Sequence, residues 1–510
     1  MDDKDWRTAT VLFAIISSVY FATVAGITSS NDGSHYALVR ALVDKRSFEI
    51  SEYLEFTENQ DYALRGDLRF SDRPPGTALL AAPLYAASAI LPGPIAPLHS
   101  KHDPDNPRVI YAVLLPVIAA STTAIILFWI LRAHFGLSQW VSVITTLAFA
   151  FGTMQWKYGS LLYSHATSGL MVMGAVAVML GETNGSTNIQ RINEYGSRGL
   201  HIRLFVSPFV DRHISVNFWL GFLLGASVLM EYTNFAFAIL AVLYWLWQTF
   251  SPSPALLGVP ARKRLAQLSF FTCGALIPAL FLMWYNSANF GSPFALSTFY
   301  ADTTRWPQNQ SFLTDFATPI WVGLPALLFY GSDNQGLFWL APVSLLGLIG
   351  LKGLWFHSPR QFVLIVGVFA AMLLLFSAST TFNPYTNDGR YITPFLALWF
   401  VVVGFGLSRM QRFAAPTSSL SSFISPLIIY GLLFLSIHNQ IMHIAFSWGH
   451  DFDLAALRLL SVAPENIVAL WRAVFPNAIN LPLWWGMLGV GWVAWRLVKS
   501  RMQSAPTSNG

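Results

Sequence analysis

Residues 31–50 read NDGSHYALVRALVDKRSFEI, and residues 69–85 read RFSDRPPGTALLAAPLY. Residues 31–85, which these two segments bound, are rich in charged side chains, although only 11% of the 510 residues are Asp, Glu, Lys or Arg. Apolar sequence lies on both sides of them. A charged segment between two apolar ones is typical of a loop that leaves a membrane, so we interpret residues 29–107 as the first outward-facing loop of a membrane protein.

The composition of the whole chain supports this interpretation. The sequence is 54% hydrophobic and 15% aromatic, and its mean hydropathy is +0.50. A soluble protein would carry about 25% charged residues, so a soluble fold is excluded. Apolar runs of about 20 residues recur between polar loops, which predicts an all-α polytopic membrane protein with about 12 transmembrane helices. The predicted spans are 8–28, 109–131, 138–155, 164–181, 216–232, 233–249, 265–285, 337–356, 361–379, 391–408, 421–440 and 481–498.

Basic residues indicate the orientation of these spans. Each turn on the side of the two chain ends carries Lys or Arg, which predicts that both termini are cytoplasmic and that the chain is a multi-pass protein of the cell (inner or plasma) membrane. The same clustering explains the net charge of +5 without nucleic-acid binding. The turns concerned contain Arg132, Arg262, Lys263, Arg264, Lys352, Arg360, Arg409, Arg412, Arg496 and Lys499.

Residues 76–91 are apolar but short for a crossing, and Pro83 interrupts them. We expect a helix embedded in the outer leaflet that does not cross, because a crossing here would invert every later loop. Two further outer loops are predicted at 286–336 and 441–480. We expect a catalytic transmembrane module over residues 1–410 and additional transmembrane helices over residues 411–510.

Asp32 follows the first predicted span by a few residues. A carboxylate at that position is partly desolvated and could act as a general base or as a metal ligand. The alternative is a helix cap, because the amphipathic sequence SHYALVRALVD begins directly after it.

Arg73 and Arg390 are candidates for binding a phosphate. Arg73 precedes Pro74, Pro75 and the short apolar segment, and Arg390 begins the tenth predicted crossing in NDGRY. A guanidinium group suits bidentate recognition of phosphate. The alternatives are a snorkelling interfacial Arg at position 73 and, at position 390, a turn followed by an aromatic anchor.

Three more residues are candidates with weaker support. His165 opens the fourth predicted crossing and could pair with Asp32 in acid–base chemistry or in binding a metal, or could be an ordinary interfacial residue. Glu231 lies between two apolar runs, where an acid is either functional or at a hydrated hairpin tip. Asp388 lies beside Arg390 in the same segment.

At these residues the chain resembles the GT-C superfamily of polytopic glycosyltransferases, which includes protein O-mannosyltransferases and lipid A aminoarabinose transferases. The resemblance covers about residues 8–410. It is carried by NDGSHYALVRALVDKRSFEI, DRPPGTALLAAPLYA, FGTMQWKYGSLLYSHATSGL and GSDNQGLFWLAPVSLLGL together with NDGRYITPFLAL. His165 departs from the aminoarabinose branch, which has an acidic metal ligand there, and Arg73 replaces a more usual Lys or His.

The resemblance implies transfer of a hexose or pentose from a polyprenyl-phosphate-linked donor to a protein, lipid or glycan acceptor on the outer side of the membrane. Asp32 would act as base or position a metal, with His165 as the second residue, and Arg73 with Arg390 would bind the donor phosphate. A divalent metal ion is a possible cofactor. No nucleotide is expected, since the chain lacks a Gly-rich phosphate loop. The alternatives are a lipid or solute transporter or flippase without transfer chemistry, and a protein similar to O-antigen ligases.

Overall fold

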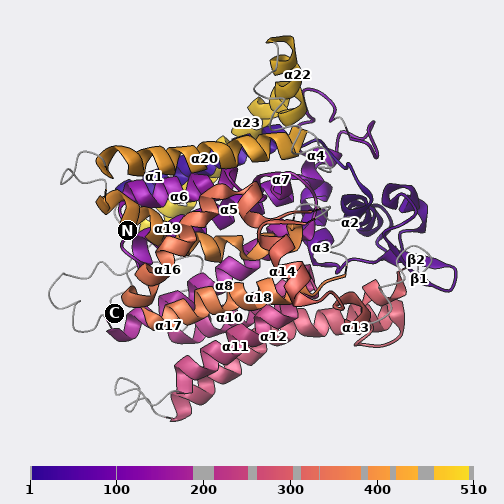
Figure 1. The fold of residues 1–510 in the computed structure, drawn as a ribbon. Helices are drawn as coiled ribbons and strands as arrows, with labels where there is room; N and C mark the ends of the chain where they lie inside the picture. The colour runs from indigo at the N-terminus through magenta and orange to yellow at the C-terminus, as the bar shows by residue number, and fades with distance from the viewer. Residues whose placement is uncertain are drawn as a thin grey trace.

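The computed structural model describes helices almost throughout the chain (Figure 1). It describes residues 3–98, 100–187, 212–250, 261–301, 312–331, 334–380, 389–413, 421–445 and 464–504. Within these ranges the only strands form two short antiparallel hairpins, β1 (Tyr62–Arg65) with β2 (Leu68–Ser71) and β3 (Tyr330–Gly331) with β4 (Asn334–Gln335). The expected all-α polytopic class is therefore confirmed.

Seven helices of the described part are long and apolar enough to cross a membrane. They are α1 (Asp3–Thr23), the run from α4 to η3 (Val109–His134), α8 (Ser164–Thr187), α12 (Ala261–Phe290), the run from α17 to α18 (Pro359–Ser377), the run from η7 into α19 (Arg390–Arg412) and α20 (Ser421–Ala445). The run from η7 into α19 is the most deeply buried of the seven, whereas α12 is mostly exposed on the outside of the bundle.

Five more helices overlap the other predicted spans, and all of them except the last have fewer than 20 residues. They are α6 (Gln139–Phe151), α10 (Arg212–Met230), α11 (Asn234–Phe250), α16 (Leu346–His357) and α23 (Leu481–Ser504). The total of about twelve crossings stays a prediction, because several of these are shorter than the about 20 residues that a straight crossing needs. The division into modules at residue 410 also stays a prediction.

The first outer loop is folded, and it lies at the end of the bundle opposite to the start of α1 (Figure 1). The expected amphipathic helix is present as α2 (Ser30–Arg40), and it continues into the π-helical turn η1 (Ala41–Lys45). The 3-10 helix η2 (Ser51–Thr57) and the hairpin β1–β2 follow. The apolar segment forms α3 (Gly76–Ala87). Twelve helical residues rise only about 18 Å, which is short of a bilayer core of about 30 Å.

The register of β1–β2 brings two acids together. Tyr62 is paired with Ser71 and Arg65 with Leu68 across a turn at Gly66, whose φ of +59° suits a residue without Cβ. Asp61 precedes the first strand and Asp72 follows the second, so both acids lie at the open end of the hairpin. A bridge from Ala63 to Ala301 fastens the hairpin to the second outer loop.

Gly33 fixes the packing of α2 against η2. A Cβ at Gly33 would lie 1.8 Å from the carbonyl oxygen of Phe56, which is backbone and cannot rotate away. We expect Gly33→Ala to destabilise the protein by about 3 kcal/mol or more. Gly431→Ala, in α20 with nothing within 4 Å, is the matched control and is expected to be neutral or slightly stabilising. Thermal unfolding in detergent measures both, and equal melting temperatures would contradict the prediction.

Candidate functional site

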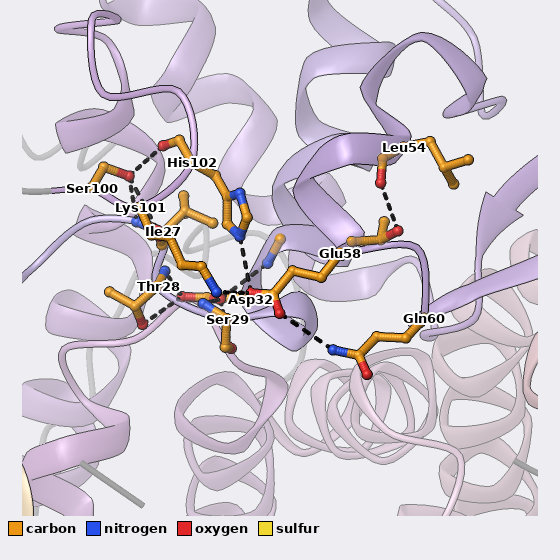
Figure 2. A network of polar contacts seen from close by, with 12 residues as sticks. Ile27, Thr28, Ser29, Asp32, Leu54, Glu58, Gln60, Ser100, Lys101 and His102 are labelled. Atoms are coloured by element: carbon orange, nitrogen blue, oxygen red, sulfur yellow. Dashed lines mark hydrogen bonds and ion pairs between the residues drawn. The ribbon is translucent and has the colours of Figure 1, made fainter. Parts of the chain in front are cut away.

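Asp32 is the third residue of α2, and its carboxylate caps the start of that helix (Figure 2). It accepts hydrogen bonds from the backbone N–H of Thr28 (2.9 Å) and from the N–H and hydroxyl of Ser29 (2.8 Å each). The side chain is fully buried. Burial raises the pKa of Asp32, while the bonds from Thr28 and Ser29 lower it. The capping alternative therefore describes the observed contacts of this carboxylate.

A second polar cluster lies beside Asp32 (Figure 2). Glu58 accepts from Lys101 at 2.6 Å and lies 3.2 Å from the ring of His102. Ser100 in turn bonds the backbone of Ile27. These contacts hold the end of η2, the segment around residue 101 and the start of α2 in one arrangement.

Tyr163 connects this capped helix end to Arg390. Its hydroxyl lies 2.8 Å from the hydroxyl of Ser29, and its ring lies 5.8 Å from the guanidinium carbon of Arg390. The same guanidinium lies 5.2 Å from the ring of Tyr391. The imidazole of His165 is buried among the rings of Tyr158, Tyr163 and Tyr391, at centroid distances of 5.0, 5.8 and 5.7 Å.

Arg73 is held at the open end of the β1–β2 hairpin. Its Nη2 lies 3.0 Å from Asp61 and its Nε lies 3.3 Å from Asp72. Ser34, one turn into α2, donates to Asp72 at 3.2 Å. Burial raises the pKa of Asp72 to about 7; Arg73 lowers this pKa and Asp61 raises it. The side chain of Arg73 remains 25% exposed, so it can contact a ligand, whereas those of Asp61 and Asp72 are almost completely covered.

Close packing of α3 on the end of α10 brings Glu231 to Arg73. A Cβ at Gly76 would lie 2.4 Å from the carbonyl oxygen of Leu229, so only glycine allows this approach. The next residue, Thr77, contacts α8 instead, where the hydroxyl of Thr167 lies 3.0 Å from its own. Glu231 directly follows α10.

The carboxylate of Glu231 accepts a hydrogen bond from Ser164. Burial raises the pKa of Glu231, while Ser164, Arg73 and Arg390 lower it. Ser164 directly follows Tyr163, whose ring lies 5.8 Å from the guanidinium carbon of Arg390, so these contacts bring Glu231 and Arg390 to the same part of the structure. The structure thus groups Arg73, Arg390 and Glu231, which come from three distant parts of the chain.

The other predicted residues lie outside the group formed by Arg73, Arg390 and Glu231. His165 lies beside this group through the tyrosine rings, and Asp32 is connected to it through Ser29 and Tyr163. Asp388 lies outside the described residues. The sequence analysis did not single out Asp61 or Asp72. Their equal distance from the two-residue turn at Gly66 and Asp67 is the signal that could have found them, because it predicts that they flank one hairpin.

Asp32 and His165 are the predicted metal-binding pair. The oxygens of Asp32 already accept the capping hydrogen bonds. Across the described ranges no three His, Cys, Asp or Glu residues gather as a metal site. The pair does not supply a ligand set on its own, and metal dependence stays a prediction.

No family model matches the sequence, and no curated protein matches it. The chain is similar to solved membrane proteins. One is ArnT from Cupriavidus metallidurans bound to undecaprenyl phosphate, at 10% identity and a TM-score of 0.46, covering 99% of this chain and 82% of the other. A second is the Archaeoglobus fulgidus oligosaccharyltransferase tethered to an acceptor peptide, at 13% identity and a TM-score of 0.48, covering 89% of this chain.

A third is the archaeal oligosaccharyltransferase AglB from the same organism, in complex with an inhibitory peptide and a dolichol-phosphate, at 12% identity and a TM-score of 0.45, covering 90% of this chain. The chain spans about three fifths of the length of these oligosaccharyltransferases (59% in both cases). ArnT and the oligosaccharyltransferases are GT-C glycosyltransferases, the superfamily that the sequence resembles. At such low identities and TM-scores, this similarity assigns no role to any individual residue of the chain.

Proposed function

We propose that the protein is a membrane glycosyltransferase that moves a sugar from a polyprenyl-phosphate-linked donor to an acceptor on the outer side of the membrane. The observation that carries this proposal is that packing contacts bring two arginines, Arg73 and Arg390, into the region of one partly buried acid, Glu231. Two cations suit a phosphate, and an acid beside them suits removal of a proton from an attacking hydroxyl.

Arg73 and Arg390 would bind the phosphate of the donor. Arg73 is held through Nη2 and Nε by two carboxylates, which leaves Nη1 outside these ion pairs. The start of α3 lies three residues further on, and the first N–H groups of a helix favour an anion. The polyprenyl tail would lie among the apolar helices.

Glu231 would act as the general base. It would take the proton of the acceptor hydroxyl while the hydroxyl oxygen forms a bond to the anomeric carbon. The bond from that carbon to the phosphate oxygen breaks, and the lipid phosphate leaves with the electron pair. The arginines stabilise the charge that develops on the phosphate. The proton on Glu231 then passes to solvent, and the products are a glycosylated acceptor and a polyprenyl phosphate.

Asp32 and His165 would position this group. Asp32 fixes the start of α2 and acts on Arg390 through Ser29 and Tyr163, and the ring of His165 packs beside Tyr391. The acceptor class and the identity of the sugar are left open by these contacts.

The role of Asp32 can be tested with Asp32→Asn. The amide replaces one of the two carboxylate oxygens by an NH2 group, which cannot accept from the backbone N–H of Thr28 or Ser29 that it then faces, so we expect a loss of stability of about 1–2 kcal/mol. Transfer per folded molecule should fall less than tenfold. A catalytic or metal-binding Asp32 would give the opposite pattern, with transfer abolished and the melting temperature unchanged. Sugar transfer and thermal unfolding are measured on the same preparations.

The test of the function uses purified protein in lipid vesicles with a polyprenyl-phosphate donor that carries a labelled sugar. We expect the label to leave the donor and to appear in acceptor material only with intact protein. Movement of the labelled lipid across the vesicle membrane without cleavage of the sugar would instead support the transporter alternative.

A further inference from the structure

Two buried acids share the guanidinium group of Arg73, which the proposed function assigns to the donor phosphate. Arg73 contacts Asp61 at 3.0 Å and Asp72 at 3.3 Å, and the side chains of these acids are only 7% and 3% exposed. Two carboxylates and one cation leave one negative charge in excess. A buried excess charge is unfavourable, so it must be balanced by a proton or by another cation. The two acids are also the groups that hold Arg73 in place.

The proposed reaction changes the charge at this point. The donor is a phosphodiester with one negative charge, whereas the product is a phosphate monoester that carries between one and two negative charges near neutral pH. Each additional negative charge on the phosphate opposes the excess charge of the two acids behind Arg73. The protonation of one of these acids would remove that opposition.

We propose that Asp72 takes up a proton when a phosphate monoester binds at Arg73 and Arg390, so that the charge of Asp72 sets how tightly the product lipid is held. This inference rests on the proposed function. Asp72 is the better proton acceptor of the two because its contact with Arg73 is longer and its side chain is more deeply covered. The proton comes from solvent, and no group is oxidised or reduced.

The surroundings of Asp72 within the described residues support this assignment. Burial and the neighbouring charge of Asp61 raise the pKa of Asp72 to about 7, so its proton exchanges near neutral pH. On the side of α2, burial and then Arg73 lower the pKa of His35 to about 3, so its imidazole is neutral. Tyr232, between α10 and α11, and Tyr285 of α12 also interact electrostatically with Asp72, and burial raises the pKa of the Tyr232 phenol. Arg390 and Glu231 interact electrostatically with the same Arg73.

The experiment measures binding of a short-chain isoprenyl phosphate to the full-length protein in detergent by calorimetry, in buffers with different heats of ionisation. Such pairs of buffers count the protons taken up on binding. For the wild type, we expect proton uptake near neutral pH. Between pH 6 and 8.5 the dissociation constants of the wild type and of Asp72→Asn should both change, and the increase for the wild type should be about tenfold larger. The ionisation of the probe itself is common to all variants and cancels in this ratio.

Two further variants should move the pH dependence in opposite directions. Asp61→Asn should lower the pH at the midpoint of the change in affinity, because the charge of Asp61 raises the pKa of Asp72. Ser34→Ala should raise it, because the hydrogen bond from Ser34 lowers that pKa. Asp105→Asn removes an exposed charge from the same outer loop and is the control, with wild-type behaviour expected. These variants keep the test decisive even if Asp72→Asn folds poorly.

If the ratio of the dissociation constants of the wild type and Asp72→Asn were the same at all pH values, the inference would be overturned and the proposed function would still stand. Equal midpoints for Asp61→Asn and Ser34→Ala would overturn it in the same way. A wild-type protein that binds no isoprenyl phosphate at any pH would instead contradict the proposed function, and the inference would fall with it.

Discussion

Replacing Glu231 by Gln is expected to lower kcat for sugar transfer about 10²–10⁴-fold, which is the range for loss of a general base. Gln has the size of Glu and can still accept the hydrogen bond from Ser164, so the ends of α8 and α10 should keep their contact. Binding of the donor should change little or become tighter, because a negative charge near Arg73 and Arg390 is removed. Transfer of a labelled sugar under single-turnover conditions, with donor affinity measured separately, checks both parts.

The pH dependence of transfer provides an independent test of Glu231. A base works in its deprotonated form, and burial raises the pKa of Glu231 above its ordinary value. The acidic limb of kcat/KM should therefore lie above the pH of about 4.3 at which an exposed glutamate titrates. Ser164→Ala should move this limb to higher pH, since it removes a bond that lowers the pKa. Glu231 would not be the general base if Glu231→Gln transferred sugar at the wild-type rate, or if the acidic limb lay at the same pH in Ser164→Ala and in the wild type.

Replacing Arg73 by Met is expected to cause the second large effect, a loss of both stability and transfer. It leaves Asp61 and Asp72 buried without their cation, and breaking a buried ion pair costs about 3–5 kcal/mol. Transfer per folded molecule should fall at least about 10²-fold, because a group that stabilises the leaving phosphate is lost. Arg73→Lys keeps the charge but offers a single ammonium group, so its stability should lie between those of Arg73→Met and the wild type.

A double variant separates the two effects of Arg73. Arg73→Met with Asp72→Asn removes one of the unpaired carboxylates, so we expect it to recover at least about 1 kcal/mol relative to Arg73→Met alone, with transfer still lost. Acidification below neutral pH should narrow the gap between Arg73→Met and the wild type, because protonation removes the charge that is left unpaired. Thermal unfolding measured at two pH values checks this. Equal melting temperatures for the wild type and Arg73→Met would show that the ion pairs contribute nothing to stability.

The sequence predicted the class of fold because lipid imposes a simple rule. A segment that crosses a bilayer must satisfy its backbone within itself, so apolar length alone reveals the helices. The short helix at residues 76–87 and the amphipathic helix after Asp32 were also predicted, from length and from the spacing of apolar residues. The number of crossings is harder to predict from apolar length, because helices such as α6 and α10 are shorter than a straight crossing needs.

The candidate site was predicted only in part. Arg73, Arg390 and Glu231 were singled out because charge is rare in this chain, and the structure places them near one another. For Asp32 the sequence left both a chemical role and a helix cap open; its observed contacts are those of a cap, and its chemical role stays a prediction. A carboxylate at the start of a helix has the same sequence pattern whether it binds the helix or a substrate. Asp61 and Asp72 escaped notice because only strand pairing brings them to one guanidinium.

The sequence by itself determined that this chain lies in a membrane. It also determined where the charged loops are and which charged residues are candidates for the site. These properties follow from local composition, since the cost of placing a polar group in lipid depends on the group and its nearest neighbours. Only the tertiary structure decided which of these residues meet. Glu231 is 158 positions from Arg73 in the sequence (231 against 73), and their approach depends on a glycine contact between α3 and α10 that no local pattern encodes.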